Sequence, residues 1–170
     1  MIRQKQLRYL VVSALFGAAI TVVTAYALHI PIPTGGYVHL GDALIYLSAC
    51  LLPAPYAIGA AAIGAGLADL LTAPMWVLPT VLIKSLVVLP FTSHREKLLC
   101  KRNLIASAAA GLISTVLYSF AACLLLGSWN AFIPQFIGTL VQAVGSAAAF
   151  LALAAALDRV DIKKRVLSDR

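Results

Sequence analysis

Charged side chains are scarce in this chain. Asp, Glu, Lys and Arg account for 11% of its 170 residues, whereas 62% of the residues are hydrophobic. Soluble domains carry about 25% charged residues, so the composition excludes an ordinary soluble domain and predicts a membrane protein. The length allows one compact helical membrane domain, residues 1–170, without spare length for a second.

Acidic residues are rarer than basic ones, six against 13. A basic excess can indicate nucleic-acid binding, but here the Lys and Arg residues lie between apolar blocks. We therefore attribute the excess to orientation in a lipid bilayer and predict no nucleic-acid partner.

Motifs of common enzyme and nucleotide sites are absent. The sequence has no GxxxxGK[ST] phosphate loop, no HExxH and no GxSxG, so it does not indicate an ATPase, a zinc protease or a serine hydrolase. The three cysteines, Cys50, Cys100 and Cys123, fall in separate segments without metal-ligand spacing. We interpret them as small apolar residues and predict no metal, no disulfide framework and no covalently bound cofactor.

Apolar blocks recur along the chain and predict an all-α bundle of six transmembrane helices. Pro53 and Pro55 disfavour helix at and before their positions, so we expect two helices between residues 42 and 71. The second, third and fourth blocks are short for a hydrocarbon core of about 30 Å, so these helices should stop beneath the outer loops or thin the bilayer. The predicted spans are residues 7–28, 42–52, 56–71, 78–91, 104–126 and 131–157.

The first block has the basic start and the TAYA end of a secretory signal peptide. However, the core of a signal peptide has about 7–15 residues, and residues 7–28 are long enough to cross a bilayer. We expect a retained first helix.

The basic residues form three clusters, and their spacing supports six spans. With six spans, all three clusters fall on one side, which must be cytoplasmic together with both termini. With five, the middle cluster and the tail would face outward. The outer loops, residues 30–41, 72–77 and 127–130, then contain no Lys or Arg. The clusters are Arg3, Lys5 and Arg8; Arg95, Lys97, Lys101 and Arg102; and Arg159, Lys163, Lys164, Arg165 and Arg170. This pattern predicts a multi-pass protein of a prokaryotic cell membrane.

Apart from Arg8, three charged side chains lie inside or at the edge of the apolar blocks: Asp42, Asp69 and Lys84. Burying a charge in hydrocarbon is unfavourable, so each is a functional candidate. Lys84 has two open interpretations, a packing pair with Asp69 or a cation that faces a ligand. Asp42 follows Gly41 at a predicted helix start, and its main expected role is an N-cap.

Other polar and aromatic residues lie near the predicted outer side. Gln135 and Gln142 are seven residues apart and share a helix face, where amides bond either to neighbouring helices or to a polar ligand. Tyr37 and Trp76 can stack on a planar ring, although anchoring at the bilayer interface is also expected of Trp76 and Trp129. Small-xxx-small pairs, which allow close helix packing, are Ala14 with Ala18, Ala60 with Gly64, and Ala62 with Gly66.

The run GGYVHLGDALIYLSACLLPAP, followed by AIGAAAIGAGLADLL and PTVLIKSLVVLPF, resembles the substrate-binding S components of energy-coupling factor (ECF) vitamin transporters. The resemblance is closest to the branch with hydroxymethylpyrimidine and pyridoxine transporters. It implies a six-helix protein that binds a vitamin from outside. It also implies a transmembrane coupling subunit and two cytoplasmic ATPases as partners. Only the ATPases would use ATP.

Single residues carry this resemblance. Ala14 and Ala18 match the AxxxA motif with which the first helix of an S component meets the coupling subunit. Further matches are Gly41 and Asp42 in LGD, Asp69 at the end of the small-residue segment, and Thr80 and Lys84 in TxxxK. Two departures are Ser85, where the family commonly has Gly, and the segment 52–55, where it favours Leu-Gly-Pro.

Our leading hypothesis is an S component without enzyme activity that captures a small water-soluble vitamin or precursor. The alternatives are a membrane enzyme acting on a lipid or isoprenoid around Asp42, Asp69 and Lys84, and a ligand-free assembly subunit that docks through Ala14 and Ala18. An autonomous ion-coupled carrier would have to import without an ATPase. The predicted substrate-binding residues are Tyr37, His39, Asp42, Asp69, Trp76, Lys84, Trp129, Asn130, Gln135 and Gln142.

Overall fold

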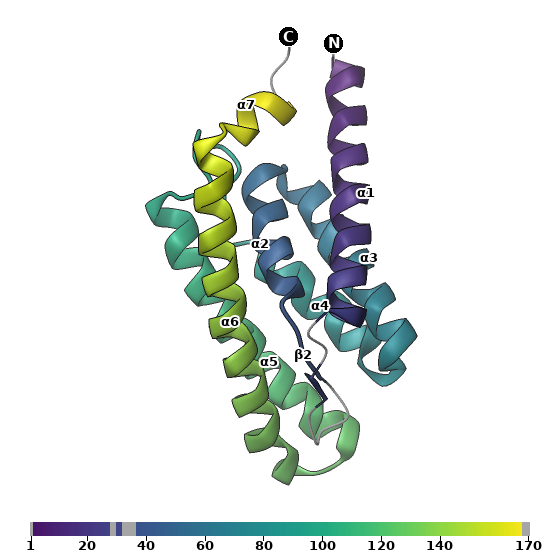
Figure 1. Ribbon diagram of the computed structural model, residues 1–170. Coiled ribbons are helices and arrows are strands. Elements are labelled where there is room, and N and C mark those ends of the chain that lie inside the picture. The colour runs from purple at the N-terminus through teal and green to yellow at the C-terminus, as the bar shows by residue number, and fades with distance from the viewer. Residues whose placement is uncertain (1, 28–29, 32–36, 168–170) are drawn as a thin grey trace.

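The computed structural model describes residues 2–27, 30–31 and 37–167, which form a helical bundle with one small hairpin (Figure 1). The hairpin pairs β1 with β2 in antiparallel register. The elements in chain order are α1 (Ile2–Tyr26), β1 (Ile30–Pro31), β2 (Tyr37–Val38), α2 (Gly41–Leu51), α3 (Ala54–Thr72), η1 (Pro74–Trp76), α4 (Val77–Val88), α5 (Lys101–Leu126), η2 (Trp129–Ala131), α6 (Phe132–Arg159) and α7 (Ile162–Leu167).

The six predicted helices are confirmed as α1 to α6. Four helical segments are long and apolar enough to cross a bilayer, and two apolar segments, 41–51 and 74–88, are shorter. The expectation of a short third helix is wrong, because α3 has 19 residues. The predicted break is confirmed, since the backbone is extended at Leu52 and Pro53 precedes the first turn of α3. The fourth helix ends at Val88, before Pro90, rather than at residue 91.

The two ends of the bundle differ in charge. Figure 1 shows both termini at one end and the β hairpin at the other. At the terminal end, Lys163 Nζ donates to the carbonyls of Ser93 and Arg95, which brings the middle and C-terminal basic clusters together. Arg170 lies outside the described residues, as does segment 32–36 of the predicted outer loop. The orientation of the basic end toward the cytoplasm stays a prediction.

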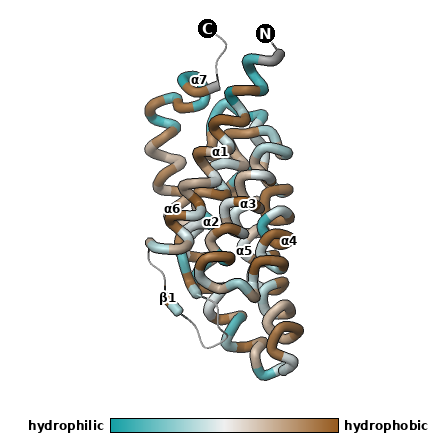
Figure 2. Tube along the Cα trace, turned by 90° about the vertical axis from the view of Figure 1, so that its right-hand side faces the viewer, coloured by the Kyte–Doolittle hydropathy of each residue, from teal (hydrophilic) through white to brown (hydrophobic). Residues whose placement is uncertain are grey.

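The flanks of the bundle are apolar. Large hydrophobic side chains such as Leu78, Ile105 and Leu124 are 70%, 71% and 83% exposed, which suits contact with lipid rather than water. Figure 2 shows hydrophobic residues along the lengths of the helices and hydrophilic segments at the end with both termini.

Helices α1 and α3 approach closely through small residues. A Cβ on Gly64 would lie 2.7 Å from the carbonyl oxygen of Gly17, so the two backbones are almost in contact. Thr21 Oγ1 donates to the Gly64 carbonyl at 2.9 Å. The expectation of close packing at the Ala60–Gly64 pair is therefore confirmed, with α1 as the neighbour.

Replacing Gly64 with Ala should destabilise the bundle, because the added methyl must push α1 away from α3. We expect a loss of about 1–3 kcal/mol in the free energy of unfolding, seen as a lower melting temperature in detergent. Gly59→Ala, on the same helix with no atom within 4 Å of its added Cβ, is the matched control. Equal melting temperatures for the two variants would contradict this packing.

Candidate functional site

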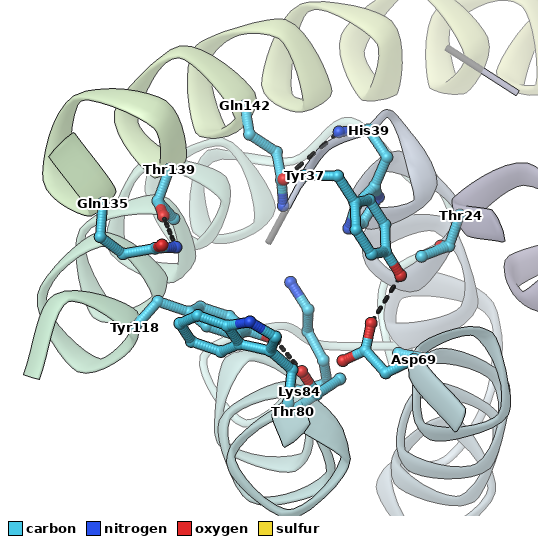
Figure 3. A pocket seen from close by; sticks show the side chains of 12 residues that line it. Thr24, Tyr37, His39, Asp69, Thr80, Lys84, Tyr118, Gln135, Thr139 and Gln142 are labelled. Carbon is cyan, nitrogen blue, oxygen red and sulfur yellow. Dashed lines mark hydrogen bonds between the residues drawn. The ribbon is translucent and has the colours of Figure 1, made fainter. Parts of the chain in front are cut away.

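A pocket near the hairpin end collects polar and aromatic side chains from α1, β2, α3, η1, α4, α5 and α6 (Figure 3). Its empty volume is about 410 Å³ including the open mouth, but the space that admits water-sized objects is about 30 Å³. That is room for about two waters, so side chains must shift before a vitamin ring can enter. The lining residues are Thr24, Tyr37, His39, Ala65, Asp69, Trp76, Thr80, Lys84, Tyr118, Gln135, Thr139 and Gln142.

A buried ion pair lies at this pocket, with Lys84 in the lining and Asp42 behind it. Lys84 Nζ lies 2.7 Å from Asp42 Oδ1, with the two side chains 1% and 2% exposed. Gln142 Nε2 donates to Asp42 Oδ2 at 3.0 Å. Of the two interpretations of Lys84 left open, the packing pair with Asp69 is therefore wrong, because the partner is Asp42. The pair joins α2 to α4, and Gln142 joins both to α6.

The prediction that Asp42 is mainly an N-cap is also wrong. Helix α2 begins at Gly41 with Leu40 at the N-cap, and no side-chain cap bond forms there within the described chain. Instead the Gly41 N–H donates to His39 Nδ1 at 3.0 Å, so a buried histidine takes the first-turn amide. The Asp42 carboxylate still lies in the first turn, where the helix dipole favours negative charge.

Aromatic and hydroxyl groups surround the ammonium of Lys84. Its Nζ lies 4.9 Å from the centroid of the Tyr118 ring, a cation–π distance. The hydroxyls of Tyr118 and Thr80 are 2.8 Å apart and hydrogen-bonded. Tyr118 was not predicted, although the sequence carries a signal for it: Ser114 and Thr115, one turn before it, are buried on the same face of α5.

Segment β2 is tied to the helices on both sides of the pocket. Tyr37 Oη donates to Asp69 Oδ1 at 2.5 Å and accepts from Thr72 Oγ1 at 3.0 Å. Burial, and secondarily the Asp69 charge, raise the pKa of the Tyr37 phenol far above its usual range, so it remains a donor. The backbone N–H of His39 donates to Gln142 Oε1 at 3.3 Å. The hairpin strand thus bonds to α3 and α6.

Trp76 was expected to anchor at the bilayer interface or to stack on a ligand, and the structure buries it inside the protein. It is 3% exposed, and its ring centroid lies 5.9 Å from that of Tyr118. Its indole N–H is buried and has no hydrogen-bond partner among the described residues. A buried unpaired donor is unfavourable, so this group is available to an acceptor that enters the pocket.

Seven of the ten predicted substrate-binding residues line this pocket. Asp42 lies behind the lining, bonded to Lys84 and Gln142, and Trp129 and Asn130 lie outside the pocket. Gln135 and Gln142 both line it from α6, as their spacing on one face indicated; Gln135 Nε2 donates to Thr139 Oγ1 at 3.0 Å. Trp129 is 73% exposed and Asn130 is also exposed. Trp129 instead packs edge-on against Phe120.

Residues 5–159 match the family model described as ECF-type riboflavin transporter, S component. The chain belongs to this family. A protein of Pyrococcus woesei, described as an uncharacterized protein in the gap 3′ region, is 33% identical over 126 residues, which cover 72% of this chain and 83% of that protein.

The family membership decides between the hypotheses. The chain is a multi-pass membrane subunit, the vitamin-binding S component of an ECF transporter, and not an enzyme. The family match names the riboflavin type and gives no support to the hydroxymethylpyrimidine and pyridoxine branch.

The ion pair gives a stability prediction. Lys84→Met or Asp42→Asn alone leaves one buried charge without its partner, and each should cost about 3–5 kcal/mol. The double variant removes both charges and should recover most of the loss. Melting temperatures of the four proteins in detergent test this coupling, which fails if the double variant shows the sum of the single losses.

Proposed function

We propose that this S component binds riboflavin in the pocket beneath β2 and presents it to an ECF module for ATP-driven import. The observation that supports this most is the combination of aromatic walls with polar groups that carry no excess positive charge. Riboflavin has a planar ring system with a polar edge and carries no net charge at neutral pH. Ligand pockets commonly combine an apolar lining with a few placed polar groups.

Charge is the first argument for a neutral ligand. Lys84 is the lysine of the pocket lining, and Asp42 compensates its charge at 2.7 Å. Asp42 lies behind the lining, whereas Asp69 contributes a carboxyl group to the lining itself. The pocket therefore has no excess positive charge with which to hold a carboxylate or phosphate, which disfavours anionic vitamins and flavin mononucleotide.

The aromatic groups are the second argument. Tyr37, Trp76 and Tyr118 line the pocket from three different elements, and aromatic rings favour offset or edge contacts with a planar ligand. The unpaired Trp76 N–H would find an acceptor in a ring carbonyl or ring nitrogen of the flavin.

The partner surface proposed for the coupling subunit is on α1. Ala14 and Ala18 are exposed, whereas Ser13 and Gly17, on a neighbouring face of the helix, pack against α3. The exposed small-residue face agrees with the AxxxA motif expected to meet the coupling subunit, which acts with two ATPases.

Riboflavin binding can be tested by titrating the detergent-purified protein and following quenching of flavin fluorescence. We expect saturable binding of riboflavin and at least tenfold weaker binding of flavin mononucleotide. Hydroxymethylpyrimidine and pyridoxine serve as competitors. Tighter binding of either competitor than of riboflavin would overturn the proposed substrate.

The role of Trp76 has its own test, since the chain has two tryptophans. Trp76→Phe removes the N–H and part of the ring, with about 1–3 kcal/mol expected from the hydrogen bond and the stacking together. Riboflavin affinity should fall about tenfold. Trp129→Phe, at an exposed position outside the pocket lining, should leave the affinity unchanged. Equal affinities for the two variants would remove Trp76 from the site.

A further inference from the structure

A second cavity, of about 280 Å³, lies at the end of the bundle that carries both termini. It is bounded by the end of α2, the start of α3, the end of α4, the connection to α5 and the first turn of α5. These 280 Å³ are the space that admits water-sized objects, for which the corresponding value in the pocket beneath β2 is about 30 Å³. The vitamin site does not account for this second cavity. Its lining residues are Ala49, Leu52, Ala54, Val88, Leu89, Phe91, Thr92, Ser93, His94 and Arg102.

One wall of this cavity is an irregular segment held in place by side chains. Asn103 is fully buried; its Oδ1 accepts from the Thr92 N–H at 2.9 Å, and its Nδ2 donates to the Thr92 and Leu98 carbonyls at 3.0 and 2.9 Å. Lys163 Nζ donates to the Ser93 carbonyl at 3.0 Å. The wall is therefore shaped by buried polar contacts.

The cavity combines an apolar interior with a cationic rim. Leu52, Val88 and Phe91 are buried apolar residues, whereas His94 and Arg102 are exposed. Arg102 Nε donates to the Pro90 carbonyl at 3.1 Å. This bond holds the guanidinium at the rim and leaves its terminal nitrogens available to another acceptor.

Within the described lining, the charged side chain at this rim is the cation Arg102. Among the lining residues that the structure describes, none is Asp or Glu. Asp158, on α6, accepts from the Leu98 and Leu99 N–H groups at 2.8 and 2.9 Å, so its carboxylate is engaged by backbone donors. Arg102 therefore faces the cavity mouth without a carboxylate in the lining.

We propose that this cavity binds the headgroup of an anionic phospholipid from the leaflet at the basic end of the bundle. Arg102, with His94 and the Ser93 hydroxyl nearby, would contact the phosphate, while Leu52 and Phe91 would contact the glycerol and first acyl carbons. Basic pockets between transmembrane helices on the cytoplasmic side are known to bind such headgroups, and guanidinium groups form strong charge-assisted bonds to phosphate. The proposal is independent of which vitamin the other pocket binds.

Native mass spectrometry of the detergent-purified protein tests the site with phosphatidylglycerol and phosphatidylcholine of the same acyl chains. Phosphatidylglycerol should bind more tightly, and Arg102→Gln should weaken it about fivefold, the effect of one basic residue near a lipid surface. Arg159→Gln, an exposed basic residue at the same end that does not line the cavity, should change it less than twofold. Equal losses for the two variants would mean general surface attraction and would overturn the site.

A second variant separates the cavity from its rim charge. Ala54 lines the cavity and is exposed, so Ala54→Phe should fill part of the space, keep Arg102 and weaken phosphatidylglycerol binding at least threefold. Unchanged binding would overturn the proposal. Competition by free glycerol 3-phosphate at equal concentration would assign the site to a soluble phosphate rather than to a lipid and would also overturn it.

Discussion

The ion pair between Lys84 and Asp42 is the constraint on which the centre of this bundle depends. Two full charges are removed from water, and each would be strongly unfavourable without the other. The 2.7 Å contact fixes the start of α2 against α4. Because Gln142 binds the second oxygen of the carboxylate, α6 takes part in the same arrangement.

The pocket beneath β2 follows from this arrangement. Its polar groups bond mainly to one another, so they are held in position before a ligand arrives. His39 makes two of these bonds: its ring Nδ1 accepts from the Gly41 N–H, and its backbone N–H donates to Gln142 Oε1. A ligand therefore meets preformed groups, and the main reorganisation is the widening of a narrow space beneath β2.

The two ends of the bundle differ in which polar residues they carry and in what those residues contact. At the hairpin end, polar side chains turn inward around a pocket, and the predicted outer loops lack Lys and Arg. At the other end, basic residues gather, and Asn103, Asp158 and Lys163 hold a connection without regular secondary structure. Between the two ends of the bundle, close packing of Gly17 on Gly64 joins α1 to α3.

The amino-acid sequence by itself determined the class, the number of helices and the break at Pro53, because transfer into a bilayer and proline geometry act locally. It also marked Asp42, Asp69 and Lys84, since any buried charge is conspicuous in an apolar chain. Only the tertiary structure decided that Lys84 pairs with Asp42.

The same limit applies to the aromatic residues. Sequence position placed Trp76 and Trp129 alike at a membrane surface, yet the turn η1 directs Trp76 into the pocket and Trp129 stays exposed. Tyr118 was not predicted, because the buried polar residues Ser114 and Thr115 of the same face were not recognised as marking the inward side of α5. Pairing and inward direction depend on how each helix is rotated against its neighbours, and that rotation is set by packing between segments far apart in the chain.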